Sequence, residues 1–205
     1  MTKRMPRTLA TRAPGRKPRR LPRALLLTDT TRLPDPRAAV ARLAPGSGVI
    51  LRHYDWPRGR RLALARDLAR LCRRRGLVLL VAGDARLALA AGADGVHLPQ
   101  RLVHHAPGLR RRPGWIVTAA AHDAGAVARA ARAGCDAVLV SPVFPTASHP
   151  GAAGLGVVRF AALAARARAA GLSVYGLGGI DAAGARRLAG IPQTGTAAIR
   201  GMAAV

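Results

Sequence analysis

The fold is decided by residues 134–149, which read GCDAVLVSPVFPTASH. The segment Ala137–Val140 is apolar and rich in β-branched residues, which predicts a buried strand. Pro142 and Pro145 follow, and because proline interrupts both helices and inner strands, they predict an extended loop. A buried strand that ends in a polar loop is the arrangement in which an α/β barrel presents its reactive groups. The polar side chains of this loop are Thr146, Ser148 and His149.

The size and composition of the chain favour one soluble domain. At 205 residues it is long enough for one substantial core, and half of it is apolar although aromatic residues make up only 3%. A core of Ala, Leu and Val is typical of packed α/β layers. No apolar run approaches the roughly 20 residues that cross a bilayer, so we expect no membrane association and a cytoplasmic location. The two cysteines, Cys72 and Cys135, have no metal-binding spacing and are predicted to be buried free thiols.

The formal net charge of +25 raises the question of nucleic-acid binding. Nearly all of this charge is arginine, spread through predicted helices, and aromatic side chains that could stack on bases are scarce. We therefore predict solvated helical faces and no specific nucleic-acid partner, although so strong a field will attract anions. The arginines assigned to these faces are Arg58, Arg60, Arg61, Arg66, Arg70, Arg73–Arg75 and Arg110–Arg112.

The N-terminal segment Met1–Arg23 is rich in Lys, Arg and Pro and has no periodic apolar pattern. Such a segment cannot bury a face, so it is predicted to be a disordered basic tail. An RNA-binding arm, a mis-assigned start and a solvated tail are the alternatives for it, and we favour the last two. The folded domain is expected to span residues 24–205.

Beyond the tail, apolar strands alternate with helical segments. The predicted strands are Leu25–Leu27, Gly48–Leu51, Leu77–Val81, Gly95–His97, Ile116–Ala119, Ala137–Val140, Ser173–Gly176 and Thr196–Ile199. The predicted helices are Asp35–Leu43, Arg58–Arg75, Ala85–Ala91, Asp123–Ala133, Leu155–Ala170 and Asp181–Ala189, with no room for a full eighth helix.

A short internal repeat shows how these units are joined. Residues 91–96 (AGADGV) and 133–138 (AGCDAV) repeat a helix end, a glycine, an aspartate and a buried strand. Such recurrence predicts right-handed parallel βα units, and eight strands predict a (β/α)8 TIM barrel. A flavodoxin-like or Rossmann sheet is the alternative, but no G-x-G-x-x-G follows the first strand.

In such a barrel the residues at the carboxyl ends of the strands form the active face. Residues 176–181 (GLGGID) lead from a strand into a helix, so the amides of Gly178 and Gly179, with the loop at Ile199 and Arg200, are candidates to bind a phosphate. A tight turn without a ligand would also use these glycines. The other polar groups at strand ends are Thr28, Asp29, Arg52, Asp84, His97, His122 and the loop Thr146–His149.

Each of these side chains has a functional and a structural interpretation. Arg52 is suited to an anion or to a salt bridge at the rim. Asp84 could bind Mg²⁺ or cap the following helix, and His97 could face either the lumen or the helices. His122 is the best candidate for a general acid/base, although it could also be an N-cap or rim residue. His104 and His105 fall in a predicted polar loop and are given no role.

Five motifs in the right order resemble the thiamine phosphate synthase/TenI family. They are Leu-Thr-Asp29, Ala-Gly-Ala-Asp-Gly-Val-His-Leu-x-Gln100, Ala-His122, Ser-Pro-Val-Phe-Pro-Thr146 and Gly-Leu-Gly-Gly-Ile180. The resemblance implies a barrel that binds a thiazole phosphate. In this family the synthase joins that molecule to a hydroxymethylpyrimidine pyrophosphate with Mg²⁺. TenI instead isomerises a thiazole carboxylate phosphate through a histidine, without metal.

Compared with the synthase pattern, this chain departs mainly where pyrophosphate and metal would bind. The synthase Gln-x-Arg-x-Lys falls on Ile50, Arg52 and Tyr54, and its Asn-Asp falls on Gly83-Asp84. Its second metal-binding Asp falls on Leu102, a Ser falls on Ala120, and a loop Lys falls on His149. Departing pyrophosphate needs Mg²⁺ and cations around it, so these losses favour proton transfer over pyrophosphate release.

We therefore favour a metal-independent, TenI-like thiazole tautomerase with no cofactor. A divergent, Mg²⁺-dependent synthase and a non-catalytic thiazole or thiamine phosphate-binding barrel are the alternatives. The expected partner is a small phosphorylated thiazole, and a homodimer could cover the barrel where the last helix is missing. The resemblance implies His122 as the catalytic residue and Asp84 as a metal ligand only in a synthase. It implies substrate or phosphate binding by Arg52, Thr146, Ser148, His149, Gly178, Gly179, Ile199 and Arg200.

Overall fold

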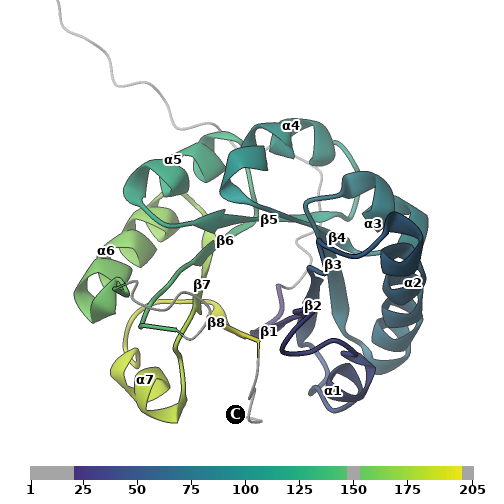
Figure 1. The fold of residues 1–205 in the computed structure, drawn as a ribbon. Coiled ribbons are helices and arrows are strands. Elements are labelled where there is room, and N and C mark those ends of the chain that lie inside the picture. Colours follow the sequence, from purple (N-terminus) through teal and green to yellow (C-terminus); the bar gives the residue numbers. More distant parts are fainter. Residues whose placement is uncertain (1–20, 147–152, 200–205) are drawn as a thin grey trace, which may run out of the picture.

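Eight parallel strands close into a barrel, with helices on its outside (Figure 1). The computed structural model describes residues 21–146 and 153–199. The strands are β1 (Ala24–Leu27), β2 (Gly48–Leu51), β3 (Val78–Ala82), β4 (Gly95–Leu98), β5 (Ile116–Ala121), β6 (Ala137–Val140), β7 (Ser173–Leu177) and β8 (Gly195–Ala198). Each strand pairs in parallel with the next, and β8 pairs with β1, where Leu26 lies opposite Ala198. The predicted TIM barrel is confirmed.

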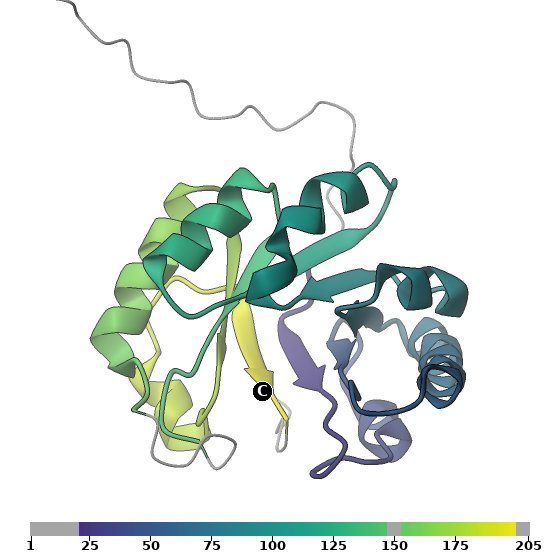
Figure 2. The ribbon, with the colours of Figure 1, turned by 45° about the horizontal axis from the view of Figure 1, so that its top comes forward.

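The helices follow the strands in alternation and surround the barrel (Figures 1 and 2). They are α1 (Arg37–Ala41), α2 (Arg58–Arg75), α3 (Ala85–Ala91), α4 (Ala106–Leu109), α5 (Ala124–Arg132), α6 (Gly156–Ala169) and α7 (Ala182–Arg187), with a 3-10 helix η1 (Gln100–His105) before α4. The prediction missed η1 and α4. Pro107 and Gly108 inside α4 disguised it as a loop, yet Val103 and Ala106 are buried and anchor this segment to the barrel. No helix in the described part of the chain is long and apolar enough to span a membrane.

Alternation along the strands separates two cores. In β1, Leu25 and Leu27 point into the lumen, where they meet residues such as Ile50, Leu80 and Tyr175. Leu26 points outward into the larger core between strands and helices. Because successive side chains of a strand face opposite sides and both sides are buried here, β1 is apolar throughout. Cys72 and Cys135 lie in the outer core, and burial raises the pKa of each thiol to about 12.

The two aspartates of the internal repeat, Asp94 and Asp136, make the same hydrogen bonds. The backbone N–H of Asp94 donates to Leu79 O (2.9 Å), while its Oδ2 accepts from Leu79 N (2.9 Å). Asp136 makes the same pair of bonds with Val117, at 2.7 Å and 2.8 Å. Each aspartate lies just before its own strand and satisfies both backbone polar groups of one residue in the preceding strand, which is its neighbour in the barrel.

Leu21 and Pro22, at the end of the predicted basic tail, pack against the amino-terminal end of the barrel. Leu21 packs against the lumen core, and the carbonyl of the buried Pro22 accepts a hydrogen bond from the Tyr175 hydroxyl (2.5 Å). Burial raises the pKa of Tyr175. Residues 1–20 of the predicted tail lie outside the described residues.

One arginine of the predicted solvated faces is in fact buried. Arg61 is only 7% exposed, and its Nη2 donates to the carbonyls of Ala82 (2.5 Å) and Leu51 (3.4 Å) at the ends of β3 and β2. Its neighbours Arg58 and Arg60 are exposed. The side chain of Arg61 lies on the inner face of α2 because two strand-end carbonyls there need a donor that their own ladders do not supply.

Candidate active site

Arg52 is fixed at the mouth of the barrel by the end of β1. Its Nε donates to Thr28 O (2.8 Å) and its Nη2 to Asp29 Oδ2 (2.8 Å). Asp29 is held in turn, because its Oδ1 accepts from the backbone amides of Thr31 and Arg32. Partial burial lowers the pKa of Arg52, and the charge of Asp29 acts against that shift. The rim salt bridge therefore exists, and an incoming anion would share the guanidinium with Asp29.

Two histidines near this region, His53 and His97, are buried and do not face solvent. His53 is buried, with Nδ1 2.8 Å from Thr28 Oγ1. His97 points into the lumen, with Nδ1 2.9 Å from Thr118 Oγ1, which settles the choice between lumen and helices. Burial first, and the charge of Arg52 second, lower the pKa of His97 to about 4. His97 is thus a neutral, internal hydrogen-bonding group beneath the mouth.

The corner formed by β2 and β3 is filled by an aromatic ring and arginines. Tyr54 lies over Gly83, where a Cβ would come within 3.3 Å of the ring, and the guanidinium of Arg61 is 5.3 Å from the ring centroid. Partial burial raises the pKa of Tyr54, while the charges of Arg52, Arg61 and Arg101 act against that shift. Tyr54 therefore occupies the space that a larger side chain at position 83 would need.

Both carboxylate oxygens of Asp84, at the same corner, already have partners within the protein. Its Oδ1 accepts from Leu87 N (2.8 Å), which caps α3, and its Oδ2 pairs with Arg58 Nη1 (2.8 Å). Leu102 stands where the synthase pattern has its second metal-binding Asp, and its side chain packs against the outer core. Within residues 21–146 and 153–199, no group of three or more His, Cys, Asp or Glu side chains could hold a metal. Mg²⁺ prefers several oxygen ligands in octahedral geometry, so these residues do not fit a magnesium site.

His122 follows β5 and is exposed at the mouth. Its Nδ1 lies 2.7 Å from the carbonyl oxygen of Ser141 at the end of β6. Because a carbonyl can only accept, Nδ1 carries the hydrogen and donates it, so the neutral ring has its lone pair on Nε2. The next residue, Asp123, caps α5 by accepting from Ala126 N (2.7 Å). His122 is therefore oriented as a base with its tautomer set by the backbone.

The loop after β6 packs directly on the double glycine after β7. The amides of Val143 and Phe144 donate to the carbonyls of Leu177 and Gly178 (2.9 and 3.0 Å). Gly178 and Gly179 have φ of +100° and +65°, and a Cβ on Gly179 would lie 2.5 Å from the Pro145 carbonyl oxygen. Close packing thus explains why both positions are glycine. The six-residue helix α7 that follows is capped by the Asp181 carboxylate, which accepts from Gly184 N (2.7 Å).

The remaining candidates are only partly covered by the structure. Thr146 lies next to Gly178, since its Cγ2 is 3.1 Å from where a Gly178 Cβ would be. Ile199 packs against the lumen core. Ser148, His149 and Arg200 lie outside the described residues. In the described part of the chain no hydrogen bond or ion pair joins His122 to Arg52 or to Asp84, so these groups line separate parts of the mouth.

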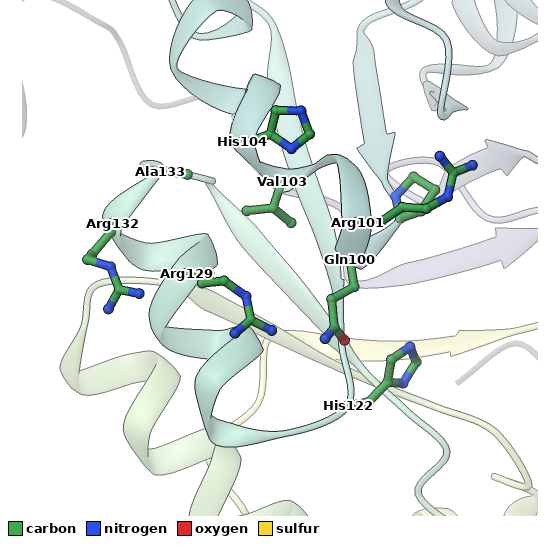
Figure 3. Close-up of a pocket in the computed structure, with 9 residues that line it drawn as sticks. Gln100, Arg101, Val103, His104, His122, Arg129, Arg132 and Ala133 are labelled. Atoms are coloured by element: carbon green, nitrogen blue, oxygen red, sulfur yellow. The ribbon is translucent and has the colours of Figure 1, made fainter.

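A groove of about 860 Å³ opens beside His122, between η1 and α5 (Figure 3). Its lining includes Gln100, His104, Arg129 and Arg132. No pattern in the sequence pointed to this groove, because η1 was not predicted. The partners Arg58 and Ser141 were missed as well. Arg58 appeared as one of many helical arginines, and Ser141 acts through a backbone carbonyl that no side-chain pattern reveals.

Comparison with known proteins gives a consistent match. The family model described as "Thiamine monophosphate synthase" matches residues 26–205. A protein of Thiobacillus denitrificans named "Thiamine-phosphate synthase" is 39% identical over 78% of this chain and 75% of its own length. One of Bordetella avium with the same name is 33% identical over 85% and 82%. A protein of Aquifex aeolicus named "Putative thiamine-phosphate synthase 2" is 33% identical over 64% and 69%.

Solved structures share the architecture. A structure titled as thiamine phosphate pyrophosphorylase from Pyrococcus furiosus superposes with a TM-score of 0.73 at 23% identity, covering 87% of this chain and 85% of that one. A structure titled "Native KDPGal structure" has a TM-score of 0.58 at 14% identity, covering 85% and 80%. At these identities the superpositions show a common barrel and no more.

Proposed function

The chain belongs to the thiamine monophosphate synthase family of thiamine-biosynthesis enzymes, and from that premise we propose that it binds a thiazole phosphate and moves a proton on it without a metal. One observation carries this proposal. His122 is presented at the mouth with Nδ1–H bound to Ser141 O, which leaves Nε2 as a base. The corner that would handle pyrophosphate and Mg²⁺ has instead Tyr54, Leu102 and an Asp84 already paired with Arg58.

The proposed reaction is the tautomerisation of a thiazole carboxylate phosphate. Nε2 of His122 would remove a proton from the ring, and the electron pair would move through the conjugated carboxylate-bearing system. The imidazolium would then return a proton at the new position, so no oxidant or leaving group is needed. The Ser141 carbonyl would stabilise the imidazolium, because Nδ1 keeps its hydrogen bond throughout.

The substrate would be held by groups on both sides of the mouth. Backbone amides at Gly178 and Gly179, with Thr146 and Ile199 beside them, are the proposed phosphate site, to which Ser148, His149 and Arg200 would contribute. Arg52 would hold the carboxylate while it stays paired with Asp29. A small soluble substrate is consistent with a cytoplasmic enzyme. We propose a homodimer as its assembly, which light scattering behind size exclusion would establish.

The second candidate is a divergent thiamine phosphate synthase, and the names of the relatives favour it. In that reaction Mg²⁺ would assist the departure of pyrophosphate, with Asp84 as its remaining side-chain ligand. Asp84 would then have to exchange Arg58 for the metal, since its Oδ2 is occupied.

One pair of assays separates the candidates. We expect tautomer conversion that persists in EDTA and falls by about 100-fold or more in His122→Ala, the range by which general acid–base catalysis contributes. Asp123→Ala, a neighbouring change that removes only a helix cap, is the control and should keep most of the activity. Mg²⁺-dependent formation of thiamine phosphate from thiazole phosphate and the pyrimidine pyrophosphate would instead establish the synthase. If both reactions fail while thiazole phosphate raises the Tm, the barrel is a non-catalytic binder.

A further inference from the structure

The groove between η1 and α5 lies beside the barrel mouth, outside the ring of strand ends. It has a volume of about 860 Å³ and reaches from His122 along the side of α5 that faces η1, as far as Arg132 (Figure 3). Only His122 is shared with the proposed active site. The groove therefore needs its own explanation.

The lining of the groove carries arginine and histidine side chains and contains no carboxylate. His104 contributes from η1, Arg129 and Arg132 from the last turn of α5, and His122 from the end of β5. Across the described residues, neither Arg129 nor Arg132 forms an ion pair. The two arginines are three residues apart on one helix face, where like charges repel by a few tenths of a kcal/mol. An anion between η1 and α5 would relieve this repulsion.

An unsatisfied polar atom lies in the same place. Gln100 Oε1 is buried and has no hydrogen-bond partner in the part of the chain that is described. Its side-chain amide lies between Arg129 and His122 (Figure 3). A buried acceptor without a partner is unfavourable, and a ligand hydroxyl would satisfy it. With the amide turned over, its NH₂ would donate to a ligand oxygen instead.

We propose that this groove binds a small polyphosphate anion, with Arg129 and Arg132 holding the phosphate oxygens and Gln100 bonding a hydroxyl or oxygen of the same ligand. Guanidinium groups suit this role because they make paired, charge-assisted bonds to phosphate. The anion would reach His122 at the inner end of the groove. The site does not depend on the proposed tautomerase reaction, since its two arginines lie on α5 and Gln100 lies on η1.

The test is calorimetric titration of the full chain with inorganic pyrophosphate in EDTA at physiological salt. The variant R129A/R132A should bind about tenfold more weakly or worse, because each charge-assisted bond is worth on the order of tenfold or more. The matched control R166A/R168A removes the same charge from the last turn of α6, where both side chains are exposed. It should bind within about twofold of the wild type, because the field of the whole protein is screened by salt. Equal weakening in both variants, or none in R129A/R132A, would overturn the proposal.

A second variant and a spectroscopic readout locate the ligand without using activity. Gln100→Glu keeps the side-chain size but adds a negative charge, and should weaken pyrophosphate binding more than R166A/R168A does. The imidazole NMR signals of His122 should shift with pyrophosphate in the wild type and not in R129A/R132A; signals that stay fixed in the wild type would contradict the site. Tighter binding of ADP than of pyrophosphate, lost in R129A/R132A, would identify a nucleotide as the source of the phosphates; tighter pyrophosphate binding would identify the free anion.

Discussion

At the scale of single residues, His97 shows how the barrel uses a histidine without exposing it. The ring is bonded to Thr118 inside the lumen, and the nearest charge that shifts its pKa is that of Arg52 at the mouth. A protonated ring there would bring a second positive charge beneath Arg52 in a low-dielectric interior. His97 therefore serves as a neutral support for the floor of the site.

This burial predicts a pH dependence of stability. The pKa of His97 is about 4 in the folded protein and near 6.5 in the unfolded chain, so between these values the unfolded state binds more protons. The contribution is complete above about pH 6.5 and is lost as the pH falls towards 4, by at most ~3 kcal/mol. His97→Gln should lose less unfolding free energy than the wild type between pH 7 and 4.5 in urea titrations.

The control for this prediction is His105→Gln, which changes an exposed histidine of η1. Burial also lowers the pKa of His53, but this residue is present in the wild type and in both variants. Its contribution to the pH dependence of stability therefore cancels in the comparison. Identical pH profiles for His97→Gln and the wild type would show that His97 is not held neutral by the fold.

At the scale of elements, the joints between helices and strands depend on aspartates. Asp84, Asp123 and Asp181 cap α3, α5 and α7. Asp94 and Asp136 form reciprocal pairs with the backbone of a neighbouring strand. The chain has only nine acidic residues, so these structural roles take up more than half of them.

Removing one of these joints has a measurable effect on stability. Asp136→Ala leaves the amide of the fully buried Val117 without its carboxylate acceptor, which should lower the free energy of unfolding by about 1–3 kcal/mol. Asp136→Asn keeps one side-chain oxygen and should lose less. Urea denaturation of the three proteins measures the order; an Asn variant that is as unstable as the Ala variant would argue against the hydrogen bond.

At the scale of the whole molecule, the boundary of the domain remains a prediction that deletion can test. Leu21 and Pro22 close the amino-terminal end of the barrel through the lumen core and the Tyr175 hydroxyl. We expect a chain that begins at residue 21 to keep its Tm within about 2 °C, whereas one that begins at residue 24 should lose several degrees, since ~1 kcal/mol shifts the Tm of a domain of this size by a few degrees. Calorimetry measures both, and equal Tm values for the two deletions would contradict the role given to Pro22.

The barrel and the family could both be predicted from the amino-acid sequence alone. Eight apolar strands and the Asp-capped helix starts are short-range patterns, and motifs such as the one ending at Thr146 carry the family resemblance in order along the chain. These features were predictable because strand burial, capping and turn formation depend on residues close together in the sequence. The short helices η1 and α4 were nevertheless not predicted, because Pro107 and Gly108 are residues typical of loops.

Which side chains contact one another depends on the tertiary structure. Arg58 pairs with Asp84 across 26 positions, Arg61 is buried beneath Tyr54, and His122 is oriented by a carbonyl 19 residues away. The groove between η1 and α5 exists only once both pack on the barrel. No local pattern encodes such contacts, because barrel closure sets the distance between strand ends and the packing of each side chain chooses its partner.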